Sequence, residues 1–170
     1  MPYTIKSKIL MAVLFSFIFL FLGCQKERGV GQIAPDLSLR DLSGRMVSLE
    51  EHRGSVTLLD FWATWCPPCR MSIPELVQLQ EKYRDRGLVI LGISLDDPNL
   101  FTSKSLLVFK ERAKINYTIL RYDQKVLKDY FGNKSPAIPT MFLVDRQGRI
   151  KEKFVGFRPG AVEKSLTEFL

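Results

Sequence analysis

Apolar and polar positions along this chain of 170 residues change their spacing several times, and each change predicts a new element. Residues 34–39 and 46–49 alternate apolar and polar with a Ser-Gly step between them, which predicts an antiparallel hairpin. Residues 56–61 form an apolar run that predicts a first core strand. The near-continuous apolar run at 88–95 predicts a central parallel strand that is covered on both faces.

Helical spacing of apolar residues predicts four helices. The first, at 67–86, directly follows the first core strand and stops at Gly87, a typical residue for a helix end. Further helices are predicted at 103–114, 124–131 and 161–170, and further strands at 117–122, 141–144 and 150–157. This alternation of strands and helices predicts one α/β domain.

The first 23 residues have the pattern of a leader. Lys6 and Lys8 precede an apolar run at 9–22, which is short for a membrane span and typical of a signal-peptide core. The run meets a glycine and then Cys24, and this junction resembles a bacterial lipoprotein signal, in which the cysteine becomes the acylated N-terminus.

The lipoprotein resemblance implies an exported protein that lipid on Cys24 holds at a bacterial membrane, facing the periplasm or the cell exterior. On this interpretation residues 1–23 are the signal peptide, 24–31 are a tether and 32–170 are the folded domain. An uncleaved N-terminal anchor and a plain secreted protein are the alternatives. Disulfides can persist in these compartments.

Composition and charge narrow the classes of partner. The chain is 46% hydrophobic and 25% charged, which is ordinary for a globular protein. Its net charge of +7 comes from scattered basic residues, without a run of Lys and Arg. This pattern predicts a solvated surface rather than a patch that binds nucleic acid, so no nucleic-acid partner is expected.

Cys66 and Cys69 stand two residues apart, where the first core strand meets the first helix. This is the sequence form of a redox-active pair. At the mouth of the helix, unpaired N–H groups and the positive end of the helix dipole favour a thiolate on Cys66. Pro67 and Pro68 fit the first turn, because that turn has no N–H bond to lose.

Two other interpretations of the cysteine pair are a structural disulfide and a metal site. A zinc site needs four ligands, and beyond the pair the chain offers only Cys24 and His52. A structural disulfide rarely closes so small a loop beside two tryptophans. We therefore expect the Cys66–Cys69 disulfide itself to be the redox group, with no further cofactor.

Asp60 is a carboxylate inside the otherwise apolar run of the first core strand. Burial without a partner would raise its pKa, because desolvation disfavours the charged form. A carboxyl group placed shortly before the cysteine pair could exchange a proton with Cys69. The alternative is an edge residue that points to solvent.

Together these motifs identify the family. Residues 60–70 with Pro74 resemble the active-site segment of thioredoxin, and 138–140 (Ile-Pro-Thr) resembles its cis-proline loop. Residues 31–49 and the insert at 97–130 resemble the membrane-anchored TlpA/ResA-type thiol-disulfide oxidoreductases, which are related to the AhpC/TSA redoxins. The resemblance implies a thioredoxin-like α/β fold, with a mixed central sheet flanked by helices, an N-terminal β-hairpin and a βα-type insert.

The resemblance also assigns roles to the reacting groups. Cys66 would be the exposed nucleophile, and Cys69 would be the buried thiol that resolves the mixed disulfide. Asp60 would be the buried proton acceptor for Cys69. These three residues are the expected catalytic group.

Four further residues would bind the substrate. Pro139 would follow a cis peptide bond, and the backbone at Ile138 would pair with an extended substrate segment. Trp65 and Pro67 would flank the nucleophile. An ordinary trans proline in a turn is the alternative at Pro139.

One departure from the ResA-type pattern bears on the substrate. Those proteins of cytochrome c maturation carry a glutamate three residues after the second cysteine, where this chain has Ser72, with Glu75 one turn further on. Many of them also have Asn where this chain has Asp60. The acid–base groups therefore resemble those of thioredoxin more closely.

The resemblance implies an extracytoplasmic enzyme that reduces disulfides of substrate proteins in cell redox homeostasis, with cytochrome c biogenesis as one setting. A membrane-embedded thiol donor would supply the electrons. A peroxiredoxin-like thiol peroxidase is the first alternative, because peroxiredoxins share the hairpin and the insert. A non-catalytic binding lipoprotein is the second.

Overall fold

The computed structural model describes residues 29–170. The predicted signal peptide (1–23) and the predicted lipid-attachment site Cys24 lie outside these residues, as does most of the tether (24–31). Within residues 29–170, no helix is both long enough and apolar enough to cross a membrane.

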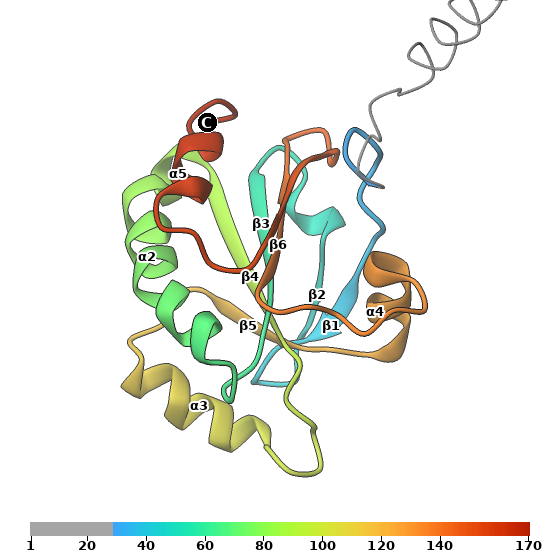
Figure 1. Cartoon of the computed structure of the whole chain (residues 1–170), viewed down its shortest axis with the longest axis vertical. Helices are drawn as coiled ribbons and strands as arrows, with labels where there is room; N and C mark the ends of the chain where they lie inside the picture. The colour runs from blue at the N-terminus through green and yellow to red at the C-terminus, as the bar shows by residue number, and fades with distance from the viewer. Residues whose placement is uncertain (1–28) are drawn as a thin grey trace, which may run out of the picture.

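A mixed sheet of five strands, in the order β5-β4-β3-β6-β7, forms the centre of the fold (Figure 1). β3 (Val56–Trp62) is the middle strand, and β4 (Leu88–Ser94) and then β5 (Thr118–Arg121) run parallel to it. On the other side, β6 (Thr140–Val144) and β7 (Ile150–Val155) are antiparallel. The chain that leaves β3 therefore emerges at the middle of the sheet, beside the start of β6.

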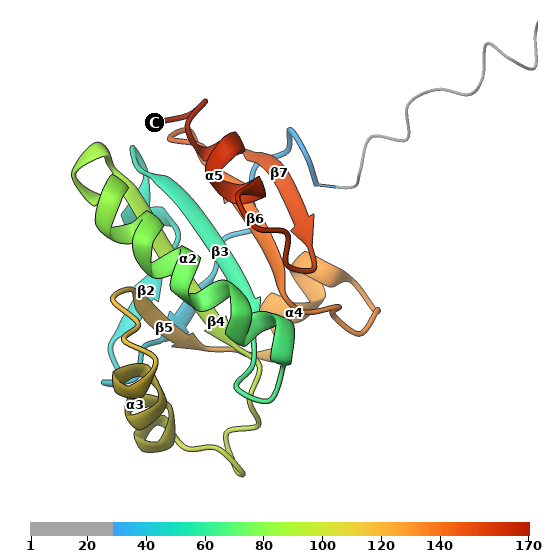
Figure 2. The same ribbon diagram turned by 60° about the vertical axis from the view of Figure 1, so that its left-hand side comes forward.

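Three helices cover one face of this sheet. They are α2 (Pro67–Tyr83), α3 (Ser103–Arg112) and α5 (Ala161–Leu166), and Figure 2 shows α2 lying along the central strands. Their apolar residues form one core cluster with strand residues such as Leu58 and Trp62.

The hairpin and one helix cover the opposite face. β1 (Ser38–Arg40) and β2 (Met46–Ser48) pair as the predicted antiparallel hairpin, and α4 (Gln124–Phe131) lies on the same side (Figure 1). Leu59 and Phe61 of β3 belong to this second core cluster. The structure therefore has the predicted fold class, an α/β fold with a mixed sheet between two layers.

Every side chain of β3 is buried, because the strand is covered on both faces. Alternation along the strand directs Leu58, Asp60 and Trp62 toward α2, and Leu59 and Phe61 toward the hairpin and α4. The carboxylate in the apolar run therefore lies under the helix that begins with the cysteine pair.

The helix ends follow local chain chemistry. α2 begins after Cys66 and passes into a 3₁₀ turn at Arg84–Arg86, after which Gly87 adopts a left-handed conformation with φ of 90°. The C-terminal helix is shorter than predicted and ends at Leu166. Beyond it the bonds tighten to 3₁₀ spacing, as in the donation from the Phe169 N–H to the Leu166 oxygen.

Candidate active site

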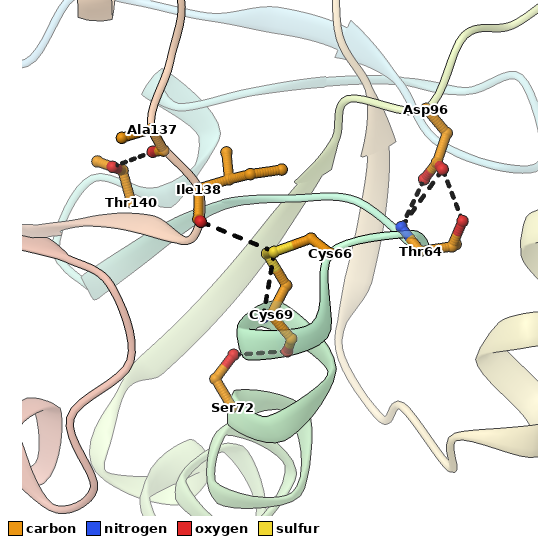
Figure 3. The surroundings of a disulfide bond; sticks show 8 residues. All are labelled: Thr64, Cys66, Cys69, Ser72, Asp96, Ala137, Ile138 and Thr140. Atoms are coloured by element: carbon orange, nitrogen blue, oxygen red, sulfur yellow. Dashed lines mark hydrogen bonds between the residues drawn. A yellow bond between two sulfur atoms is a disulfide. The ribbon is translucent and has the colours of Figure 1, made fainter.

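A disulfide joins Cys66 and Cys69 across the first turn of α2, with 5.3 Å between their Cα atoms. Cys66 is the N-cap residue, and the backbone N–H of Cys69 donates to the Cys66 Sγ atom at 3.2 Å (Figure 3). In the reduced protein the same N–H and the helix dipole favour negative charge on Cys66. The geometry thus supports a nucleophilic role for the first cysteine of the pair.

The expectation that Cys66 is exposed is wrong for the disulfide-bonded state. Its exposed fraction is 3%, against 0% for Cys69. The carbonyl oxygen of Ile138, in the loop before β6, lies 3.7 Å from the Cys66 sulfur (Figure 3). Beside this covered sulfur, Trp65 is 67% exposed and Pro67 is also exposed.

The loop before β6 lies against the cysteine pair. Its Ile138–Pro139 peptide bond is cis, as the resemblance implies, and Pro139 is buried. Thr140 donates its hydroxyl to the Ala137 oxygen at 2.5 Å and closes the loop on itself. A disulfide sulfur carries no proton, so the approach of Cys66 to Ile138 is a contact in this state and becomes a hydrogen bond only with a thiol donor.

Asp60 is fully buried in the middle of β3, between Gly92 of β4 and Met141 of β6. The alternative of an edge residue that points to solvent is therefore wrong. Neither carboxylate oxygen has a hydrogen-bond partner among residues 29–170, and burial raises the pKa of Asp60 to about 7. A carboxyl group with such a pKa can accept and release a proton at neutral pH. Its role toward Cys69 stays a prediction.

A second buried aspartate, which the sequence reasoning missed, holds the segment before the nucleophile. Asp96 is 2% exposed and follows the end of β4. It accepts hydrogen bonds from the Thr64 N–H at 3.1 Å and the Thr64 hydroxyl at 2.6 Å (Figure 3). It also accepts from the Ser94 hydroxyl at 2.8 Å. The carboxyl ends of parallel strands meet at one sheet edge, and that rule applied to β3 and β4 is the signal that could have found Asp96.

The departures from the ResA-type pattern have structural roles here. Ser72 is buried and donates its hydroxyl to the Cys69 oxygen at 2.8 Å. Glu75 accepts from the Gly160 N–H at 3.1 Å and so ties α2 to the start of α5. Within residues 29–170, no carboxylate is hydrogen-bonded to either cysteine of the pair.

Comparison with known proteins agrees with this site. Residues 30–153 match the AhpC/TSA family. The chain is 38% identical to the thiol-disulfide oxidoreductase ResA of Geobacillus kaustophilus over 129 residues, which cover 75% of this chain and 70% of that protein. It is 34% identical to the thioredoxin-like protein YneN of Bacillus subtilis, covering 78% of this chain and 76% of that one.

Solved structures that resemble this fold also include thiol-disulfide oxidoreductases. A putative thiol:disulfide interchange protein DsbE from Chlorobium tepidum superposes with a TM-score of 0.70 at 34% identity, covering 82% of this chain and 96% of that one. The thioredoxin domain of a thiol-disulfide oxidoreductase from Bacteroides vulgatus gives a TM-score of 0.72 at 27% identity, with the same two coverages. The chain therefore belongs to the AhpC/TSA family and, within it, to the thioredoxin-like thiol-disulfide oxidoreductases.

Proposed function

We propose that this protein is an extracytoplasmic, lipid-anchored reductase of protein disulfides. The observation that carries the proposal is the asymmetry of the cysteine pair. The Cys66 sulfur sits at the helix N-terminus beside the Ile138 carbonyl, whereas Cys69 lies inside the first turn with no exposed surface. In the reduced protein we therefore expect the first sulfur, which lies beside the exposed Trp65 and Pro67, to be the one that meets a substrate.

The proposed reaction is a two-electron exchange. The Cys66 thiolate attacks one sulfur of a substrate disulfide, that S–S bond breaks, and the other substrate sulfur leaves as a thiolate. Cys69 then gives its proton to Asp60 and attacks the Cys66 sulfur, the mixed S–S bond breaks, and the second substrate sulfur leaves as a thiolate. The substrate gains two electrons, and the enzyme keeps the Cys66–Cys69 disulfide. A membrane-embedded thiol donor would return the electrons.

Substrate recognition is proposed to use the cis-proline loop. An extended segment would pair with the backbone at Ile138, above Pro139, and its side chains would contact Trp65 and Pro67. Backbone pairing gives affinity with little demand on sequence. Such recognition suits an enzyme with several substrate proteins, and apocytochrome c is one substrate that the resemblance implies.

The proposed position of the protein at an extracytoplasmic membrane surface rests on the predicted lipoprotein signal in residues 1–23 and on the predicted attachment of lipid to Cys24. The prediction is that Cys24→Ala moves the protein out of the membrane fraction while the purified domain keeps its reductase activity. A Cys24→Ala protein that stays in the membrane fraction would favour the uncleaved anchor.

The order of attack is tested by trapping. Cys66→Ala should abolish reduction of insulin disulfides, and Cys69→Ala should accumulate mixed disulfides with substrate, seen on non-reducing gels. Mixed disulfides that form with Cys66→Ala and not with Cys69→Ala would reverse the assignment. The reduction potential of the pair then gives the direction: a value near that of thioredoxin, about −270 mV, supports a reductase, and one near DsbA, about −120 mV, a disulfide donor.

One assay on purified protein and one in cells test the two alternatives. Rapid consumption of hydrogen peroxide that survives Cys69→Ala would favour a thiol peroxidase. Full function in cells of a Cys66→Ser, Cys69→Ser double variant would favour a non-catalytic binding lipoprotein.

A further inference from the structure

Polar atoms without a hydrogen-bond partner gather under α2. Of the six such buried side-chain atoms among residues 29–170, four belong to this region: both carboxylate oxygens of Asp60, the indole Nε1 of Trp62 and the hydroxyl of Tyr117. The three residues are between 0% and 3% exposed. Buried polar atoms in proteins are nearly always hydrogen-bonded, so a cluster of them needs a common partner.

Gly92 brings these side chains together. It pairs with Asp60 in the register of β3 and β4, so the two residues are direct neighbours on the face toward α2. A methyl group at position 92 would lie 3.0 Å from the Trp62 Nε1 atom and 3.1 Å from the Tyr117 Cε2 atom. The Trp62 and Tyr117 rings therefore converge over the bare backbone of Gly92, beside the carboxylate.

The chemistry of the three groups is complementary. The Trp62 indole only donates, the Tyr117 hydroxyl donates or accepts, and an ionised Asp60 only accepts. A buried water typically makes about three hydrogen bonds to such groups. One water that accepts from the indole and the hydroxyl and donates to the carboxylate would satisfy all three.

We propose that Asp60, Trp62 and Tyr117 enclose a buried water site, through which Tyr117 acts as a positioning residue for the Asp60 carboxylate. Two fixed donors behind the water stabilise the charged carboxylate and so set the pH at which it can accept a proton. The inference rests on the role proposed above for Asp60, and it adds the residue that tunes that role.

The surroundings leave Tyr117 as the group able to tune the aspartate. Burial, and then the nearby Asp60 charge, raise the pKa of Tyr117 well above its usual range, so the hydroxyl keeps its proton. Lys110 of α3 donates its ammonium to the Tyr117 carbonyl oxygen at 2.8 Å, on the backbone side of the residue. From α2, Glu75 accepts from the Gly160 N–H, Tyr83 and Lys82 donate to Glu163, and the cysteines are joined in the disulfide, which does not titrate.

A carbon-13 titration of the Asp60 carboxyl in the disulfide-bonded protein tests the water site directly. Tyr117→Phe removes the donor and should move the midpoint up by about one pH unit, because the charged form loses a hydrogen bond. The matched control is Tyr130→Phe, which removes a half-buried hydroxyl bound to the Pro35 oxygen at 2.7 Å on the opposite face, and should leave the midpoint unchanged. An unchanged midpoint in folded Tyr117→Phe would overturn the inference.

A second probe covers a variant that does not fold. With 3-fluorotyrosine at position 117, the hydroxyl is a stronger donor of almost the same shape, and the midpoint should move down. No movement with this residue would overturn the inference even if Tyr117→Phe were unstable.

Kinetics separate the water site from the role of Asp60. The release of substrate from a preformed mixed disulfide on Cys66, followed across pH, should become about fivefold slower at pH 7 in Tyr117→Phe if the midpoint rises by one unit from about 7, because the ionised fraction of Asp60 falls from about one half to about one tenth. A carboxyl midpoint that moves while the rate profile stays fixed would support the water site and remove the proton role proposed for Asp60.

Discussion

Two buried aspartates on the same sheet have opposite surroundings. Asp60, in the middle of β3, has no hydrogen-bond partner among the described residues. Asp96, just past the end of β4, accepts from the N–H and hydroxyl of Thr64 and from Ser94. The two carboxylates therefore have different roles: one without a protein donor can change its protonation, and one with three protein donors holds a loop in place.

The two aspartates should also affect the stability of the fold in opposite directions. A buried carboxylate without partners opposes folding when it is charged, because desolvation is not offset. Hydrogen bonds from buried donors to a carboxylate stabilise the fold. Proteins retain groups of the first kind where chemistry requires a perturbed pKa.

Asp60→Asn should stabilise the disulfide-bonded protein at alkaline pH. Burial raises the pKa of Asp60 from 3.8 to about 7, so the folded state holds the proton more tightly than the unfolded state. This contribution to stability is full below about pH 4 and is lost as the pH rises to about 7. The variant, which never ionises, should gain up to about 4 kcal/mol over the wild type at pH 8.

Denaturant unfolding of the two proteins at pH 4 and pH 8 measures this gain. The difference between them should nearly vanish at pH 4, where wild-type Asp60 is half protonated even when unfolded. A gain of equal size at both pH values would show that ionisation is not its cause.

Asp96→Ala should have the opposite sign. It removes a carboxylate that three donors share and leaves the part-buried Thr64 N–H and the buried Ser94 hydroxyl without that partner. We expect a loss of about 3 kcal/mol in the free energy of unfolding, measured in denaturant at pH 7. Asp97→Ala is the matched control, because the neighbouring side chain is exposed and caps only its own turn through the Asn99 N–H. Equal losses in both variants would contradict the role of Asp96.

Asp60→Asn should slow resolution more than the first attack. A positioned general base typically contributes at least about 100-fold, so release of substrate from a mixed disulfide on Cys66 should fall by about that factor at pH 8. The first attack by Cys66 should change much less, because its thiolate is stabilised by the helix N-terminus. Stopped-flow traces that show the same change in both steps would remove the proton role.

The sequence was sufficient where chemistry is local. Three predicted features depend on residues that are close together in the chain: the CxxC pair at a strand–helix junction, the helix stop at Gly87 and the carboxylate of Asp60 in an apolar strand. The structure confirms the order of the elements and the burial of Asp60. Helix α4 has the predicted bounds because a capping aspartate and a glycine stop enclose it.

The remaining features depend on which distant segments meet. Asp96 follows β4 in sequence, yet its partner Thr64 follows β3, and only the strand order brings them together. The covered sulfur of Cys66 likewise needs Ile138, which enters from the start of β6. Tyr117 stands at the start of the predicted strand at 117–122, and only the fold places its ring over Gly92 beside Trp62. Patterns within a short stretch of sequence do not predict such contacts.

Thr64→Val should have the smallest effect on stability, because it removes only one of the hydrogen bonds that Asp96 accepts. Valine keeps the shape of threonine and removes the hydroxyl that donates to Asp96 at 2.6 Å, while the backbone N–H bond at 3.1 Å remains. We expect a loss of about 1 kcal/mol in the free energy of unfolding. Thr118→Val, at the start of the edge strand β5, is the control that should change it little. A negligible loss in Thr64→Val would mean that the backbone N–H alone holds the segment before Cys66, and that Asp96 needs its main-chain partner more than its side-chain one.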